Sequence, residues 1–417
     1  MLRLVGIRLT LYNGGFIQRT FVNPDLARLQ PYPFQRLRAL FHGITPAGDF
    51  TPINLSIGEP KHATPPLIRE ALLQHLDGLA NYPATQGMDG LRISIARWLE
   101  RRYRLPHINP QTQVLPVSGS REALFAFAQT VIDRAKQPVV ISPNPFYQIY
   151  EGAALLAGAT PYYLNTQPEN GYRMDFGAVP EAILNRTRLV YVCSPGNPIG
   201  KVMTLEDWRE LFALSERHGF VIAADECYSE IYFDEAHPPL GALEAAHRLG
   251  REDFVNLVVF SSLSKRSNVP GMRSGFVAGD AQILEKFLLY RTYHGCAMNP
   301  AIQMASQAAW QDEAHVIENR RLYRHKFAAF KTALSGTLEL EMPDAAFYYW
   351  VKTPIADTEF ALGLHRDYNV TVLPGRFLAR EAHGVNPGAD FVRIALVASE
   401  AECAQAAQRI KNFIQTL

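Results

Sequence analysis

Short apolar runs rich in β-branched residues alternate with helix-like stretches through the middle of this chain, and this alternation constrains its fold more than any other feature. The runs that predict strands span residues 113–117, 138–141, 189–193, 220–224 and 257–260. Predicted helices span residues 120–133 and 204–218, and another begins near residue 146. Such alternation is typical of an α/β fold in which helices cover a parallel sheet.

The pattern changes near residue 300. A long helical stretch over residues 302–334 precedes scattered strand-like runs near residues 338–341, 347–351, 371–373 and 391–395. This mixture predicts a smaller α+β domain that follows the sheet domain. We therefore expect a large domain over residues 61–300 and a small domain over residues 301–417, to which residues 23–60 also contribute.

Residues 1–22 precede the predicted fold. Short apolar pieces follow Arg3, but Arg8 interrupts them, so the segment lacks the unbroken apolar run of a secretory signal. We expect these residues to form an extension that is disordered or does not belong to the native protein.

The charge balance and the cysteines argue against several classes of protein. The 417 residues include 41 Lys and Arg against 40 Asp and Glu, whereas a nucleic-acid binder normally concentrates a basic excess. No run of about 18 uninterrupted apolar residues predicts a membrane-spanning helix. The 4 cysteines form no CxxC pair, which argues against a disulfide framework or a zinc cluster. We expect a cytoplasmic protein that binds no nucleic acid, membrane or metal.

Polar residues, together with one glycine, follow the predicted strands at the points where the strands end. They are Ser118, Gly119, Ser120, Asn197, Asp225, Tyr228, Ser262 and Lys265. Each has a plainer explanation when taken alone: Asp225 as a helix cap, Lys265 as a solvated lysine and Asn197 as a turn residue. In open α/β sheets, however, these strand ends face one crevice in which ligands bind. Their joint occurrence therefore favours a shared ligand site.

The residue types suit a phosphorylated aromatic aldehyde that contains a ring nitrogen. Residues 118–120 lie at a predicted helix start, where free N–H groups and the helix dipole favour a phosphate. Ser262 and Arg273 add a hydroxyl donor and a positive charge. Asp225 can hold a ring nitrogen protonated, and Lys265 can form a Schiff base with the aldehyde.

Several motifs also occur in a familiar order and spacing. They are Asn-Leu-Ser-Ile-Gly-Glu-Pro (54–60), Asn-Tyr-Pro (81–83), Val-Ser-Gly-Ser-Arg (117–121), Ser-Pro-Gly-Asn-Pro-Ile-Gly (194–200), Ala-Asp-Glu-Cys-Tyr (224–228), Ser-Ser-Leu-Ser-Lys (261–265) through Pro-Gly-Met-Arg-Ser-Gly (270–275), and Phe-Val-Arg (391–393). On these motifs the chain, from about Pro31 to its end, resembles the class I/II aminotransferases, which are pyridoxal-phosphate enzymes of fold type I.

The resemblance implies both a fold and a set of partners. The fold has a large domain with a mostly parallel seven-stranded sheet flanked by helices, together with a smaller α+β domain. The cofactor is pyridoxal 5′-phosphate, and the partners are small-molecule amino-acid and 2-oxo-acid substrates. The assembly is a homodimer with shared active sites.

The resemblance further implies roles for four residues around the cofactor ring. Lys265 holds the cofactor as a Schiff base and, once substrate releases it, moves the proton. Asp225 keeps the pyridine nitrogen protonated, which makes the ring an electron sink. Tyr228 and Asn197 hydrogen-bond the phenolic oxygen and so lower the pKa of the Schiff base.

The resemblance also implies residues that bind the cofactor phosphate and the face of its ring. The cofactor-binding loop contributes Gly119, Ser120 and Arg121, and Ser262 and Arg273 match further phosphate binders. Tyr147 matches the aromatic ring stacked on the cofactor, with the adjacent Phe146 as an alternative after a one-residue slip. Tyr82 matches a tyrosine that reaches the phosphate from the neighbouring subunit.

Substrate binding is expected at two ends of the site. Arg393 matches the arginine that grips the substrate α-carboxylate with a planar fork, and Asn197 and the backbone near Gly58 belong to the same end. Arg121 follows Ser120 directly, and we expect it to bind the distal carboxylate of the substrate. The alternative is a structural arginine at a helix start, where the dipole does not favour a cation.

Two local motifs indicate a narrower group of enzymes within this family. Lys-Arg-Ser-Asn-Val-Pro-Gly (265–271) and Gln-Pro-Tyr-Pro-Phe (30–34) are similar to bacterial N-succinyldiaminopimelate aminotransferases, which serve the succinylase branch of lysine synthesis. We expect amino transfer between N-succinyl-LL-2,6-diaminopimelate and 2-oxoglutarate. The alternatives are a general aspartate, aromatic or alanine-type aminotransferase and a C–S β-lyase on the same scaffold. A transcription regulator would need a winged-helix domain, for which the residues before Asn23 are too few.

Overall fold

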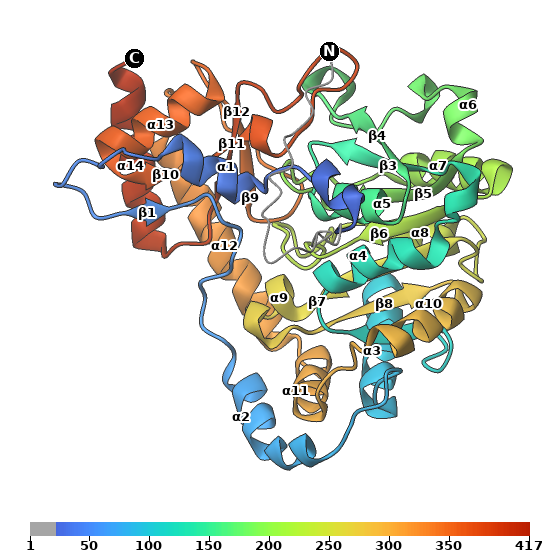
Figure 1. Ribbon diagram of the computed structural model, residues 1–417. Helices are drawn as coiled ribbons and strands as arrows, with labels where there is room; N and C mark the ends of the chain where they lie inside the picture. Colours follow the sequence, from blue (N-terminus) through green and yellow to red (C-terminus); the bar gives the residue numbers. More distant parts are fainter. Residues whose placement is uncertain (1–21) are drawn as a thin grey trace, which may run out of the picture.

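The computed structural model describes residues 22–417, and its largest element is a seven-stranded sheet (Figure 1). The strands are β2 (Val114–Val117), β3 (Val139–Asn144), β4 (Thr160–Asn165), β5 (Thr187–Cys193), β6 (Val221–Asp225), β7 (Leu257–Ser262) and β8 (Gly275–Gly279). Their order across the sheet is β2-β8-β7-β6-β5-β3-β4. Only β8 runs antiparallel to its neighbours, so the predicted mostly parallel sheet is confirmed.

Helices cover both faces of this sheet. One face packs against α3 (Asp89–Tyr103), α7 (Leu205–His218), α8 (Ala242–Arg248) and α11 (Pro300–Gln311), and the other against α4 (Ser120–Val131), α5 (Ile149–Leu156) and α10 (Ala281–His294). Side chains alternate between the two cores along β5, with Val190 and Val192 in the first and Leu189 and Tyr191 in the second. Because both faces are buried, the central strands are mostly apolar.

A second apolar core lies beside the large sheet. It contains an antiparallel sheet of order β11-β12-β9, a parallel strand pair β1-β10, and three helices. These elements are β1 (Ile53–Asn54), β9 (Tyr348–Lys352), β10 (Val370–Thr371), β11 (Leu373–Pro374), β12 (Phe391–Ala395), α12 (Ala314–Ala333), α13 (Asp357–Tyr368) and α14 (Glu400–Gln415). Figure 1 shows α12 running from the large sheet to this second core. The expected α+β unit is therefore present.

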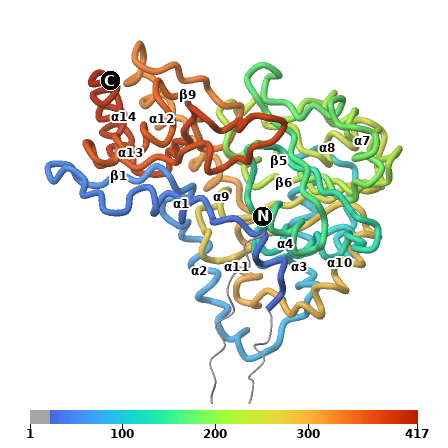
Figure 2. Tube along the Cα trace, turned by 45° about the horizontal axis from the view of Figure 1, so that its top comes forward, coloured from blue at the N-terminus to red at the C-terminus, as the bar shows by residue number. Residues whose placement is uncertain are grey.

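The N-terminal segment bridges the two units. Figure 2 shows it in blue, passing from the side of α4 through α1 (Pro33–Leu40) to β1. β1 pairs in parallel with β10, which comes more than 300 residues later in the chain. This pairing supports the expected contribution of residues 23–60 to the small domain, although the domain limits remain a prediction. After β1 the chain continues into α2 (Pro66–Gln74), which packs against α11.

Some elements differ from the sequence expectation for physical reasons. The sequence pattern missed β4, which contains Pro161 and is the edge strand where proline is tolerated, and β8, which glycines bound at both ends. The strand expected near residues 338–341 is wrong, because that segment has no partner strand. The helix expected over residues 302–334 is two helices, separated where Asp312 takes an extended backbone. The remaining short helices are α6 (Glu181–Leu184) and α9 (Leu263–Arg266).

None of the helices within residues 22–417 is long and apolar enough to cross a membrane. The prediction for residues 1–22 falls, apart from Val22, outside the described residues.

Candidate functional site

A cavity of about 490 Å³ opens at the carboxyl ends of the parallel strands. Most of the residues predicted from the sequence line it: Gly58, Ser120, Arg121, Tyr147, Asn197, Asp225, Tyr228, Ser262, Lys265, Arg273 and Arg393. They converge because β2, β5, β6 and β7 run in one direction, so the loops that follow these strands meet at the same edge. Residues spread over more than 300 positions thus share one site.

Asp225, the last residue of β6, lies buried at the floor of the cavity. Its Oδ2 accepts a hydrogen bond from the Tyr150 hydroxyl at 2.7 Å, and its Oδ1 accepts one from the Cys227 backbone N–H at 3.2 Å. Burial raises the pKa of Asp225, and these hydrogen bonds oppose that rise. A cationic ring nitrogen would give this carboxylate the counter-charge that makes its burial favourable.

Lys265 belongs to the short helix α9, is half-buried and lines the cavity. Burial lowers the pKa of Lys265, with Arg273 adding to that effect and Asp225 opposing it. A lower pKa favours the neutral amine, which is the form that attacks a carbonyl carbon.

The end of the cavity near the start of α4 is suited to binding an anion. Ser120 opens the 12-residue helix α4, and the Cys227 thiol lies 2.9 Å from its Oγ and 3.8 Å from the Ser262 Oγ, so the two serines converge. Gly119 has a φ of 90°, and a Cβ at that position would overlap the Arg273 guanidinium. Glycine is therefore required for Arg273 to reach this end.

Arg393 on β12 defines the end of the cavity nearest the second core. Its Nη1 donates to the Asn197 Oδ1 at 2.9 Å and its Nη2 to the Ser56 carbonyl at 2.7 Å, while its guanidinium lies 4.4 Å from the centroid of the Tyr348 ring. Among the described residues, the buried Nε of Arg393 has no hydrogen-bond partner. An incoming carboxylate can supply the missing acceptor.

Tyr348 is a site residue that the sequence did not indicate. Its hydroxyl lies 2.8 Å from the Tyr228 hydroxyl, and a side chain at Gly58 would collide with it. Gly58 thus lets the backbone approach this end of the cavity closely. Tyr150 was missed as well; its ring centroid lies 5.8 Å from that of Tyr147.

Of the two adjacent aromatic residues, Tyr147 and not Phe146 faces the cavity, while the stacking of its ring on the cofactor remains a prediction. Tyr147 lines the cavity, whereas Phe146 is buried away from it and stacks on Tyr163 with centroids 5.2 Å apart. The Arg121 Nε donates to the Tyr147 hydroxyl at 2.5 Å, and its Nη2 donates to the Tyr32 hydroxyl at 3.3 Å. Tyr32 comes from the N-terminal segment, and the sequence analysis assigned it no role in the site.

Tyr82 does not line the cavity of its own chain. Its side chain is fully exposed to solvent. Its expected role, reaching the phosphate of a neighbouring subunit, and the homodimer that this role requires remain predictions.

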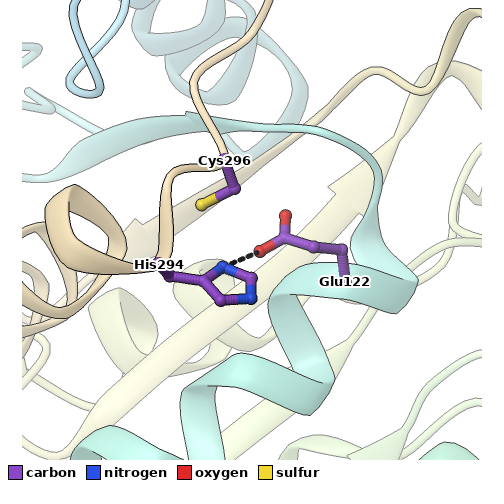
Figure 3. Close-up of side chains that lie close together, drawn as sticks. All are labelled: Glu122, His294 and Cys296. Carbon is purple, nitrogen blue, oxygen red and sulfur yellow. Dashed lines mark ion pairs between the residues drawn. The ribbon is translucent and has the colours of Figure 1, made fainter.

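A second cluster, of Glu122, His294 and Cys296, has the residue types of a metal site (Figure 3). However, both carboxylate oxygens of Glu122 accept hydrogen bonds from the buried Arg291, at 2.7 and 2.9 Å. A bound cation would face this guanidinium at close range. We therefore assign the cluster to ion pairing.

The donor set of the cavity fits pyridoxal phosphate. An anion-binding end, a buried carboxylate, an amine and an aromatic ring are all present, and the glycine at position 119 leaves the space that the anion end needs. Lys265, Asp225, Ser120 and Ser262 are the residues that would hold it.

Comparisons with known proteins agree with this fit. A family model described as aminotransferase class I and II matches residues 51–410. The crystal structure of an aminotransferase from Neisseria meningitidis Z2491 is 51% identical, covering 93% of this chain and 99% of that chain, with a TM-score of 0.90. An LL-diaminopimelate aminotransferase from Dehalococcoides mccartyi is 30% identical over 369 residues, which are 87% of this chain and 91% of that protein. A probable N-succinyldiaminopimelate aminotransferase from Thermus thermophilus is 26% identical, covering 88% of this chain and 95% of that chain, with a TM-score of 0.78.

Proposed function

This chain belongs to the class I and II aminotransferases, which depend on pyridoxal phosphate, and we propose that it exchanges an amino group between N-succinyl-LL-2,6-diaminopimelate and 2-oxoglutarate. The observation that carries the proposal is a pair of guanidinium groups, Arg393 and Arg121, that line one cavity from different elements. 2-Oxoglutarate carries one carboxylate at the reacting centre and one distant from it, and the succinylated substrate carries one at the reacting centre and two distant from it. Two arginines match that pattern.

We assign the chemistry to this chain's residues as follows. When bound, pyridoxal phosphate supplies an electron sink that lowers the barrier to loss of the substrate Cα proton. Lys265 Nζ takes that proton, and Asp225 holds a proton on the ring nitrogen. Asn197 and Tyr228 hydrogen-bond the phenolic oxygen, and Arg393 binds the α-carboxylate and so orients Cα.

Arg121 is the residue that we expect to read the distal carboxylate. The hydroxyls of Tyr147 and Tyr32 hold its guanidinium at the cavity wall. Arg121→Ala should raise the KM for glutamate and for the succinylated substrate by about 10- to 100-fold, because a hydrogen-bonded charge pair is lost. Its kcat should change much less, since this contact is made equally in the ground and transition states.

Steady-state kinetics would check this expectation, with alanine as the matched control because it has no distal carboxylate. The KM for alanine should stay within about twofold of the wild-type value. Unchanged KM values for glutamate and the succinylated substrate would show that Arg121 is only a structural arginine at the start of α4.

A second candidate substrate is LL-diaminopimelate without the succinyl group. It is favoured by the name of the Dehalococcoides mccartyi relative, an LL-diaminopimelate aminotransferase. The two substrates share the reacting amino acid and a carboxylate at the far end. They differ at the far nitrogen, which is a free amine in LL-diaminopimelate and an amide that bears a succinyl carboxylate in the other substrate.

A half-reaction distinguishes these substrates. The pyridoxal-phosphate-loaded enzyme would be mixed separately with N-succinyl-LL-diaminopimelate, LL-diaminopimelate, aspartate, alanine and phenylalanine while its visible absorbance is followed. We expect the fastest loss of visible absorbance with the succinylated substrate. A faster loss with LL-diaminopimelate would select the second candidate, and an equal or faster loss with an ordinary amino acid would exclude both.

A further inference from the structure

The short helix that carries Lys265 ends in buried carbonyl groups that need hydrogen-bond donors. α9 has only four residues, and the last carbonyls of a helix have no partner within it. The Nδ2 of Asn319 on α12 donates to the Lys265 carbonyl at 3.1 Å and to the Arg266 carbonyl at 3.3 Å. Asn319 therefore caps this helix from a different part of the chain.

The chemistry of the neighbours determines how the Asn319 amide is oriented. Two carbonyls can only accept, so they must face its nitrogen. The Asn319 Oδ1 then accepts from the Asn268 Nδ2 at 3.1 Å and from the His62 Nδ1 at 2.7 Å. All four hydrogen bonds of the amide are thus made, and its side chain is only 2% exposed. A buried amide whose donors and acceptors are all hydrogen-bonded has one favourable position.

A further pair of residues stabilises this arrangement from behind. Because His62 Nδ1 donates to Asn319, its Nε2 is free to accept, and the Lys326 Nζ lies 2.7 Å from it. Burial lowers the pKa of His62, and the charge of Lys326 lowers it further, so the neutral ring with its hydrogen on Nδ1 is favoured. The chain of contacts runs from Lys326 through His62 and Asn319 to the Lys265 backbone.

The helix that supplies Asn319 also reaches the second core. Tyr323, Phe327 and Phe330 of α12 pack in the same apolar cluster as β12, the strand that carries Arg393 (Figure 1). One turn before Asn319, the His315 Nε2 lies 2.8 Å from the Ser267 Oγ, so α12 holds the turn after Lys265 at two points. One rigid helix thus connects the Lys265 backbone to the unit that holds the proposed carboxylate-binding arginine.

We propose that Asn319 is a positioning residue for the aminotransferase reaction, which places the Lys265 amine by holding its peptide carbonyl. The proposal rests on the proposed role of Lys265 as the group that moves the Cα proton. A displaced Lys265 backbone carries Nζ away from the reacting atoms, and a misplacement of about 1 Å can slow a reaction about 100-fold. Asn319 touches no reacting group and acts only through the Lys265 backbone.

Two substitutions test this proposal. Asn319→Asp keeps the shape but replaces the donor with an oxygen that faces two carbonyls, and Asn319→Leu removes all four hydrogen bonds. Both should lower kcat by about tenfold while the KM for glutamate stays within about twofold. In the loaded enzyme without substrate, the pH midpoint of the visible absorbance should shift by about half a unit or more, because it reports the surroundings of the Lys265 nitrogen.

A matched control separates positioning from general loosening. Phe330→Leu removes core packing from the same helix but contacts no residue of the Lys265 turn. It should lower the Tm as the Asn319 variants do and leave kcat and the absorbance midpoint unchanged. If Phe330→Leu moved both quantities as far as the Asn319 variants do, or if folded Asn319 variants kept the wild-type values, the positioning role would be wrong.

His62→Leu decides the question if the Asn319 variants do not fold. It removes the donor to the Asn319 Oδ1, and we expect a smaller shift of the absorbance midpoint accompanied by a smaller fall in kcat. A wild-type midpoint in His62→Leu would overturn the proposal. The role of Lys265 itself is tested separately by its alanine variant, so failure of the proposed function is distinguishable from failure of this inference.

Discussion

Lys265→Ala is expected to lower the rate of amino transfer by about 10⁴-fold, the upper range for losing a positioned acid–base group. The Lys265 side chain lines the cavity, and no other lysine does so among the described residues. Its removal leaves the Cα proton without a base. Single-turnover kinetics, followed by the loss of visible absorbance on mixing with glutamate, would measure the effect.

Chemical rescue and a control substitution would show that the loss of rate comes from the missing Lys265 amine. A small primary amine such as methylamine should restore part of the lost rate, because it can enter the space left by the side chain. Lys201→Ala is the matched control, since Lys201 lies outside the cavity and pairs with Glu341 and Asp344. A Lys265→Ala enzyme that retained a tenth of the wild-type rate would contradict the proposed role.

Asp225→Asn should reduce kcat by about 10²- to 10³-fold, which is typical of losing one preorganised electrostatic group. The amide is neutral, so it cannot stabilise a proton on the ring nitrogen, and the electron sink becomes weaker. Asp225→Glu keeps the charge and should retain more activity. Steady-state kinetics of both variants, together with the dissociation constant of pyridoxal phosphate, would measure the two effects.

Asp234→Asn is the control for the second expectation. Asp234 is exposed and pairs with His237, away from the cavity. Its substitution should leave kcat unchanged. Equal kcat values for wild type and Asp225→Asn would mean that the buried carboxylate does not serve the cofactor ring.

The placement of the main site residues was predictable because alternating strands and helices indicate parallel strands, and local patterns mark where each strand ends. A run such as β6 is recognisable from its composition, and a polar residue at its end, Asp225, points to the edge where parallel strands end. The same reasoning placed Asn197 after β5 and Ser262 at the end of β7. Each of these inferences needed only a few neighbouring residues.

Other site residues could not be found in this way. Tyr150 bonds Asp225 across 75 residues, Tyr348 meets Tyr228 across 120, and Asn319 reaches the Lys265 carbonyl across 54. None has a local pattern that distinguishes it from an ordinary buried tyrosine or a helical asparagine. Their roles arise from contacts between distant segments.

The sequence by itself determined the α/β class of this protein, the family resemblance and the residues at the strand ends, since these depend on periodicity and on local motifs. Only the tertiary structure decided that Tyr147 rather than Phe146 lines the cavity, that β4 and β8 complete the sheet, and that α12 supports the Lys265 turn. The physical reason is that packing and hydrogen bonding join groups by distance in space. A buried carbonyl or carboxylate takes its partner from whichever segment the fold brings within about 3 Å.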